Sequence, residues 1–353
     1  MLTLAACSFG KNEARPAELA SGEQLPTRCL APKVEQAETV TFVANGRAWA
    51  LDPRGGRLGC LFTVQNAGPF AWGPRGDRAL LARLQVKALP GAPTRRPSDI
   101  EPRASSWGRP TGKSIVFVGR GGRALLKAHP GSARFVDVTP VKGVRYEHVV
   151  YHPSGLAFAF VLRQGKHESI WISSNVGKKP QKLVHGRLHT GFDAIAFGDN
   201  GQSLYFAAQH VDHRVDVHSL QLVGATSAPV VWRGAPEEHV TDLVPGGYGQ
   251  VAFTVGRSCE TRHAVIVTPT HKRGSELLKE HSPSRVVGWY DRRHLLVAAG
   301  GCGDKLDLYS VADTTLNARL LVRNVDAASV RRAEEFPPPP LPPSVLGEAS
   351  SFA

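Results

Sequence analysis

The chain has 353 residues, of which 42% are hydrophobic, so it can bury the core of one large domain or of two ordinary ones. Its net charge is +13, but no block of Lys and Arg with interleaved aromatic residues is present, which excludes nucleic acid as an expected partner. No run approaching about 18 apolar residues occurs, so we expect any membrane attachment to use an anchor and not a span.

The N-terminal tetrapeptide Leu4-Ala5-Ala6-Cys7 resembles the lipobox of a bacterial lipoprotein signal peptide. The resemblance implies that Cys7 is lipid-modified, that residues 1–7 are the remnant of a signal, and that the polar residues 8–38 form a tether. Only six residues precede Cys7, fewer than an ordinary export signal contains. The alternative is a buried or free thiol. The resemblance implies an extracytoplasmic protein, anchored by lipid to a bacterial membrane on its periplasmic face or at the cell surface.

The next segment, residues 39–332, has the pattern of an all-β domain, because Gly and Pro punctuate short runs of Val, Leu, Phe and Ala. It opens with a hairpin over residues 41–51 that turns at Asn45-Gly46, followed by a strand through Cys60. These strands lack an inner partner, and residues 327–330 lie where one is expected. We therefore expect the two ends of the domain to share one blade and leave no open sheet edge.

Between these ends, a short apolar strand, a Gly-containing turn and a second apolar strand recur six times, 35 to 47 residues apart. A period in this range indicates stacked units, here four-stranded blades of about 42 residues. The recurring segments are Ala71-Trp72-Gly73-Pro74-Arg75-Gly76-Asp77, Ser106-Trp107-Gly108-Arg109-Pro110-Thr111-Gly112-Lys113, Val150-Tyr151-His152-Pro153-Ser154-Gly155, Ala196-Phe197-Gly198-Asp199-Asn200-Gly201-Gln202, Leu243-Val244-Pro245-Gly246-Gly247-Tyr248-Gly249 and Gly288-Trp289-Tyr290-Asp291-Arg292-Arg293.

These turns resemble the inner hairpin of TolB-like and WD-type propellers, which often reads Trp-Ser-Pro-Asp-Gly. The resemblance covers residues 39–332 and implies a closed β-propeller, a scaffold that hosts many unrelated functions. Six motifs and the shared terminal blade predict seven blades. Six is the alternative, because the segment after Trp72 is short and its third strand is indistinct. Residues 333–353, which include Pro337–Pro343, are expected to form a disordered Pro-rich tail.

Four cysteines remain beside Cys7. Cys259 and Cys302 both follow the second strand of their blades, and equivalent loops of adjacent blades lie side by side, so we expect them to form a disulfide. Cys29 and Cys60 then pair by elimination and hold the tether to the shared blade. Two disulfides indicate an oxidising compartment. Zinc ligation is the alternative, although no Cys-x-x-Cys spacing is present.

Four histidines precede the inner strands of their blades: His148, His189, His239 and His281. At those positions they could ring the mouth of the central channel and bind a metal or an anionic ligand, or they could be ordinary turn residues. Resemblance adds that some TolB-like propellers are metal-dependent oligogalacturonate lyases with channel histidines. No further motif of those enzymes is present.

The segment from His210 to His218 is also rich in possible ligands. Strand alternation would place His210, Asp212, Arg214, Asp216 and His218 on one side. The interposed Arg214 favours a solvated, charge-paired face over a metal site, so we assign no metal and no cofactor. A Gly-x-Ser-x-Gly elbow is absent from the sequence, which argues against a serine hydrolase.

No acid, base or nucleophile constellation stands out in the sequence. We therefore expect a non-catalytic, monomeric lipoprotein of the cell envelope whose propeller binds an envelope protein or a cell-wall glycan. Two alternatives stay open. One is a metal-dependent enzyme acting on an anionic saccharide through the histidine-lined channel, and the other is an extracellular sensor of a small ligand.

Overall fold

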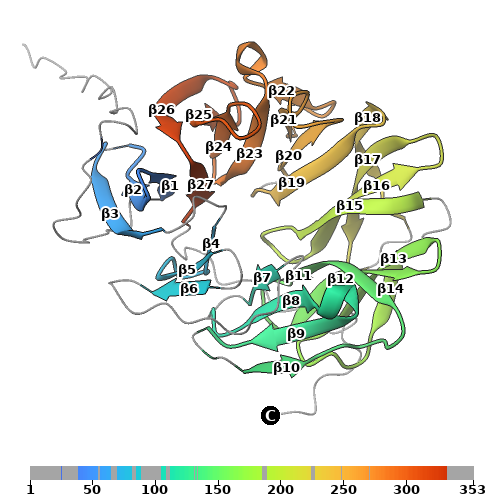
Figure 1. Cartoon of the computed structure of the whole chain (residues 1–353). Helices are drawn as coiled ribbons and strands as arrows, with labels where there is room; N and C mark the ends of the chain where they lie inside the picture. Colours follow the sequence, from blue (N-terminus) through green and yellow to red (C-terminus); the bar gives the residue numbers. More distant parts are fainter. Residues whose placement is uncertain are drawn as a thin grey trace, which may run out of the picture.

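A computed structural model of the protein describes Leu25 and residues 39–331, apart from residues 55, 65–69, 82–84, 89–104, 109–111, 131, 133, 185–188, 224–226, 248 and 270. The regular elements in this part of the chain are antiparallel strands, together with the short 3-10 helices η3 (Arg120–Gly122) and η5 (Lys279–His281). The sheets stand around a common centre as the blades of a propeller (Figure 1). The prediction of an all-β propeller is therefore confirmed.

The described strands form six sheets of four strands and one sheet of three. Each blade is named below after its inner strand. The first three sheets along the chain contain β1 (Val40–Ala44), β2 (Arg47–Leu51) and β3 (Leu58–Thr63); β4 (Ala71–Trp72), β5 (Arg78–Leu81) and β6 (Gln85–Ala88); and β7 (Ser105–Trp107), β8 (Ile115–Gly119), β9 (Ala124–Ala128) and β10 (Phe135–Asp137). The next two contain β11 (Arg145–Tyr151), β12 (Ala157–Gln164), β13 (His167–Ser174) and β14 (Gln181–Val184); and β15 (His189–Phe197), β16 (Ser203–His210), β17 (Arg214–Gln221) and β18 (Val230–Pro236). The last two contain β19 (His239–Pro245), β20 (Val251–Gly256), β21 (His263–Val267) and β22 (Ser275–Leu277); and β23 (Ser284–Trp289), β24 (His294–Ala299), β25 (Leu306–Ala312) and β26 (Ala318–Val325).

The two ends of the described chain meet in one sheet. The last strand, β27 (Ala327–Val330), pairs with β1 so that Val40 lies opposite Val330. The Thr41 hydroxyl also donates to the Ser329 carbonyl oxygen at 2.7 Å. This sheet, β27-β1-β2-β3, is the shared terminal blade that the incomplete first hairpin predicts.

Six four-stranded blades are present in the described part of the chain, so the prediction of seven is not confirmed. The β4 sheet has three described strands, and the fourth would have to lie within residues 89–104, which are outside the described residues. The β4 sheet also has a shorter stretch of chain available than the other blades. Only 35 residues separate Trp72 from Trp107, fewer than between any other two adjacent anchors.

The repeated aromatic-turn-Gly pattern joins one blade to the next. The Trp289 indole, 2% exposed, packs on the preceding blade and donates from Nε1 to the Val244 carbonyl oxygen at 3.1 Å. A Cβ atom at Gly246 would lie 2.7 Å from the Trp289 ring. Glycine is therefore needed at position 246, because the Trp289 ring of the following blade occupies that space. A Cβ atom at Gly73 would lie 3.5 Å from the Trp107 ring, an ordinary contact, and one at Gly108 would lie 2.7 Å from Ser114 Oγ and 3.4 Å from the Tyr151 ring.

We expect Gly246→Ala to lower the free energy of unfolding by about 1 to 3 kcal/mol, because the added methyl group overpacks the Trp289 contact. Gly247→Ala is the matched control, since a Cβ atom there meets nothing within 4 Å. Urea unfolding of both variants measures the difference. Equal stabilities for the two variants would show that the contact with the Trp289 ring is not the reason why residue 246 is glycine.

A buried histidine makes a similar link between turns. His152 is fully buried, and its Nε2 lies 2.8 Å from the Gly201 carbonyl oxygen in the next blade, to which it must donate. Its Nδ1 accepts from the Ser154 backbone N–H at 3.1 Å. A proton on Nδ1 would oppose that N–H. Burial, the largest cause, accordingly lowers the pKa of His152 below its ordinary value.

This arrangement predicts a loss of stability in mild acid. Because the pKa of His152 is lower in the folded state, the unfolded chain binds more protons below about pH 6.5, and the free energy of unfolding falls as the pH falls. Burial also lowers the pKa values of His148 and His218, which adds to the slope. Denaturant titrations between pH 7.5 and 5 should show a shallower slope for His152→Gln than for the wild type. An unchanged slope would contradict the assignment.

Candidate functional site

The inner strands of adjacent blades begin on the same face of the propeller. In the registers of these blades, Arg145 lies opposite Arg163 and His239 lies opposite Gly256, so the start of each inner strand is beside the end of the second strand. The loops that follow the second strands therefore open on that face. We call it the N-terminal face, since β11, β15, β19 and β23 begin there.

Each of these four inner strands has an irregularity in its register near its start. The shifts fall between Tyr146 and Val149, Phe192 and Ala194, Thr241 and Val244, and Val286 and Gly288. A β-bulge redirects side chains and interrupts the ladder of backbone hydrogen bonds. Ionisable residues occupy the bulges of the first three strands: Glu147 and His148, Asp193, and Asp242.

Residues at or beside three of these bulges line an open pocket of about 310 Å³ at the N-terminal face. It lies between the β11, β15 and β19 blades. Its lining residues are Glu147, His148, Arg163, Glu168, Phe192, Asp193, His239, Val240 and Thr241. Among the described lining residues, three carboxylates thus accompany one guanidinium.

Asp193 joins the β15 and β19 blades across the pocket. Its Oδ2 accepts from the Val240 backbone N–H at 2.9 Å and from Gln209 Nε2 at 2.8 Å. His239 Nδ1 lies 3.3 Å from the same oxygen. The carboxylate is therefore held in one position by donors from two blades.

Glu168 has the equivalent role between the β11 and β15 blades. Its side chain is 3% exposed, and Oε2 accepts from the Phe192 backbone N–H at 2.8 Å. Oε1 accepts from Arg163 Nε at 2.6 Å, and the Arg163 NH2 group completes a two-point ion pair. Arg163 NH1 also lies 3.9 Å from Glu147 Oε1.

A third interface uses a hydroxyl group in the same way. The Val286 backbone N–H, at the bulge of β23, donates to Thr254 Oγ1 at 2.9 Å, and this hydroxyl donates to Asp242 Oδ2 at 3.0 Å. Side chains of one blade thus accept the N–H groups at the bulges of the next. Glu168 and Asp193 are thus held in place by donors from two adjacent blades.

The structure brings together two of the four predicted channel histidines. His148 and His239 both line the pocket. Burial is the largest influence on His148 and lowers its pKa, although Glu147, Glu168 and Asp193 oppose the shift. His281 lies in η5 and stacks on Tyr309 with ring centroids 5.0 Å apart. The side chain of His189 is outside the described residues.

Basic side chains gather farther round the N-terminal face. Arg262 precedes β21 and Arg285 lies on β23, and the Ser284 backbone N–H donates to the Arg262 carbonyl oxygen at 3.1 Å. Burial and then the neighbouring Arg285 charge lower the pKa of Arg262. Among the described residues, no acceptor lies within hydrogen-bond distance of either Nε atom, and both Nε atoms are buried.

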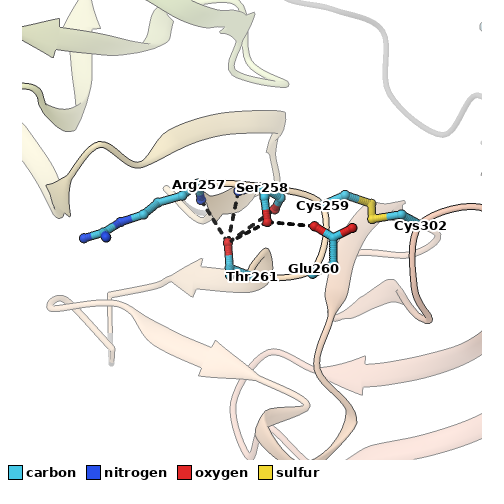
Figure 2. The surroundings of a disulfide bond; sticks show 6 residues. All are labelled: Arg257, Ser258, Cys259, Glu260, Thr261 and Cys302. Carbon is cyan, nitrogen blue, oxygen red and sulfur yellow. Dashed lines mark hydrogen bonds between the residues drawn. A yellow bond between two sulfur atoms is a disulfide. The ribbon is translucent and has the colours of Figure 1, made fainter.

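Cys259 and Cys302 form a disulfide that joins the β20–β21 and β24–β25 loops on the N-terminal face, with Cα atoms 5.7 Å apart. This is the pair expected from their matching positions in adjacent blades. Figure 2 shows Thr261 Oγ1 accepting from the Arg257 and Ser258 backbone N–H groups, which shapes the loop beside the bond. The disulfide therefore ties together two blades that border the channel.

Cys60, on β3, is also disulfide-bonded. Its expected partner, Cys29, lies outside the described residues, as does Cys7 at the predicted lipid attachment site. The Cys29–Cys60 pairing therefore stays a prediction. In the described part of the chain, no helix is long and apolar enough to cross a membrane.

The segment from His210 to His218 departs from its prediction in two ways. It is not one strand: β16 ends at His210, a turn follows, and β17 begins at Arg214. The predicted charge pairing is present, with Arg214 Nε 3.5 Å from Asp216 Oδ1, but the face is only partly solvated, because Asp216 and His218 are buried. The fold back at the turn brings His210, Asp216 and His218 together, with one ligand atom of each within 4.8 Å of the others.

Comparison with known proteins identifies the fold and no activity. No family model matches the chain, and no curated protein sequence matches it either. Among solved structures, a prolyl endopeptidase aligns with a TM-score of 0.58 at 12% identity over 86% of this chain, which spans 50% of the endopeptidase. Oligogalacturonate lyase from Vibrio parahaemolyticus aligns with a TM-score of 0.53 at 9% identity. The alignment covers 78% of this chain and 89% of the lyase chain. TolB from Acinetobacter baumannii aligns with a TM-score of 0.50 at 10% identity, over 85% of this chain and 67% of the TolB chain. A scaffold shared by proteins of such different activities does not decide the function.

Proposed function

We propose that the protein is a non-catalytic binding module whose pocket at the N-terminal face receives a basic group of a protein partner. The observation that carries the proposal is the fixed set of carboxylates around the pocket. Glu168 and Asp193 are held by backbone N–H groups of adjacent blades, and Glu147 stands beside them, with Arg163 as the one guanidinium among the described lining residues. Preorganised charge of this kind favours a cation that enters the pocket.

The charge distribution around the face favours a protein over a glycan. The pocket between the β11 and β19 blades carries an excess of carboxylates, whereas Arg262 and Arg285 lie farther round the same face. A polypeptide offers charges of both signs at fixed spacings. A uniformly anionic saccharide would be repelled at the pocket, which argues against the enzyme alternative considered from the sequence.

Photo-crosslinking in intact cells tests this proposal. A photoreactive residue at Thr241, which is exposed at the pocket, should capture one discrete protein. The matched control is Val176, 52% exposed in the β13–β14 loop on the opposite face. Adding Glu147→Gln should reduce capture at Thr241. Equal capture at Val176, or capture of a glycan, would contradict the proposal.

We further propose that the propeller is displayed outside the cytoplasm on a lipid anchor at Cys7. The lipobox-like Leu4-Ala5-Ala6-Cys7 supports this proposal, and so does the Cys259–Cys302 disulfide, since such bonds persist in oxidising compartments. Residues 8–38 would then act as the tether and residues 333–353 as a Pro-rich tail. The β4 sheet would be the seventh blade of the closed ring.

The anchor gives a direct prediction. We expect Cys7→Ser to move most of the protein from the membrane fraction to the soluble fraction, because stable attachment depends on the acyl chains. Mass spectrometry of native protein should show a lipid-modified Cys7 as the N-terminal residue. Residues 1–6 still attached in native material would rule out this anchor.

A further inference from the structure

The His210, Asp216 and His218 cluster lies in the β15 blade, on the side that faces the β11 blade. His218 stacks on Phe206 with ring centroids 4.9 Å apart, and Phe206 belongs to the same buried hydrophobic cluster as Ile170 and Ile172 of the β11 blade. Asp216 lies opposite Ala208 of the same layer. The three polar side chains therefore continue an apolar interface toward the N-terminal face, at the end where β16 turns into β17.

Burial and distance distinguish this cluster from an ordinary surface ion pair. Asp216 is 2% exposed, whereas the side chain of His210 keeps 24% of its surface exposed. His210 Nε2 lies 3.3 Å from Asp216 Oδ2. Two ligand atoms held about 2.0 to 2.1 Å from a tetrahedral zinc ion stand roughly 3.3 Å apart, so this spacing is that of a tetrahedral edge.

Hydrogen bonding gives His218 the tautomer that a metal ligand needs. Its Nδ1 lies 3.0 Å from the Ala228 carbonyl oxygen, which can only accept, so Nδ1 must carry the proton. The neutral ring then keeps its lone pair on Nε2. A histidine whose second nitrogen donates to a carbonyl oxygen is the usual arrangement around protein-bound metals.

We propose that His210, Asp216 and His218 bind one Zn²⁺ ion, with the fourth position open toward solvent beside His210. Two imidazoles and one carboxylate suit Zn²⁺ and other late divalent metals better than Ca²⁺ or Mg²⁺, which take oxygen ligands. The proposal concerns a site outside the pocket and stands independently of the proposed partner.

The neighbouring arginines set how tightly the ion can bind. Arg214 Nε lies 3.5 Å from Asp216 Oδ1, and Arg233 Nε lies 3.9 Å from Oδ2. Arg214 is on the oxygen away from His210 and can stay as an outer partner of the carboxylate. Arg233, with 67% of its side chain exposed, competes with the ion for Oδ2 and can swing into solvent. Its removal should therefore strengthen metal binding.

Equilibrium dialysis of the chelator-treated full-length protein against Zn²⁺ tests the site. We expect one ion per chain, and we expect Arg233→Gln to tighten binding roughly threefold to tenfold. His218→Ala and His210→Gln should each weaken it by more than the roughly 10- to 100-fold that loss of an outer partner costs. His213→Asn is the control: His213 is exposed in the same turn at φ +61°, a conformation that Asn tolerates.

Co²⁺ substitution gives a second readout, because a tetrahedral site with nitrogen ligands produces visible absorption bands. These bands should persist in His213→Asn and disappear in His210→Gln. If His218→Ala fails to fold, the partly exposed His210 and the gain of affinity in Arg233→Gln decide the question. No stoichiometric Zn²⁺ in the wild type, or equal affinity in the wild type and His210→Gln, would overturn the proposal.

Discussion

We expect Glu168→Ala to lower the free energy of unfolding by about 2 to 4 kcal/mol. The substitution leaves the buried Phe192 N–H without its acceptor, removes the partner of the Arg163 guanidinium, and opens a small cavity between two blades. Arg163 keeps 45% of its side chain exposed, so water can solvate part of the released charge and limit the loss. Urea unfolding measured by intrinsic fluorescence gives the difference.

Two further variants separate this network from the general effect of removing a carboxylate. Glu276→Ala removes an exposed carboxylate on β22 and should change stability by less than about 0.5 kcal/mol. Glu168→Gln keeps the size of the side chain and one acceptor oxygen, so it should fall between the wild type and Glu168→Ala. A Glu168→Ala protein as stable as Glu276→Ala would show that Glu168 does not join the blades.

Loss of the Cys259–Cys302 disulfide should have an effect of similar size. The bond closes a loop with a sequence separation of 43 residues, and a double replacement by Ser is expected to destabilise the fold by about 2 to 4 kcal/mol. Ser258→Ala, in the same loop, is the control and should lose less than about 1 kcal/mol, because Ser258 is exposed and its hydroxyl bonds only within the loop.

Peptide mapping without reduction provides the structural check on this prediction. Peptides containing Cys259 and Cys302 should be recovered as one linked species. A Cys29 peptide linked to either of them would contradict the Cys259–Cys302 pairing. A double variant as stable as the wild type would contradict the stabilising effect of this bond.

The features that were predictable from the sequence are those with a local physical signature. The turn at Asn45-Gly46 and the strand at residues 327–330 predict a shared terminal blade, and β1 and β27 do pair. The aromatic-Gly repeat marks the blades, and Gly246 makes room for the Trp289 ring of the next blade. Matching loop positions were enough to place Cys259 beside Cys302.

The pocket could not be predicted in the same way, because its residues are placed by bulges. Glu147 and Asp193 each stand four residues before the aromatic anchor of their blade, an offset that could have drawn attention to them. Alternation alone does not show where a ladder will shift register. The histidines illustrate the point: His148 and His239, close to the bulges, line the pocket, whereas His281 lies before its strand, in η5.

The segment from His210 to His218 shows a second limit of sequence patterns. Alternating polar residues are typical of one exposed strand face, but here a three-residue turn reverses the chain within the segment. Residues on two strands then meet on a buried face. The sequence contains no Gly or Pro at this turn to signal it, and His213 adopts the positive φ instead.

Affinity for basic and acidic peptides tests the central claim, that the pocket binds a cationic group of a protein. Two dodecapeptide pools, one rich in Lys and Arg and one rich in Asp and Glu, would be titrated by fluorescence anisotropy at physiological salt. The net charge of +13 would by itself favour the acidic pool. Tighter binding of the basic pool would therefore indicate binding at the pocket. We predict tighter binding of the basic pool and a loss of about fivefold in Glu147→Gln. Preference for the acidic pool, or no change in Glu147→Gln, would contradict the account.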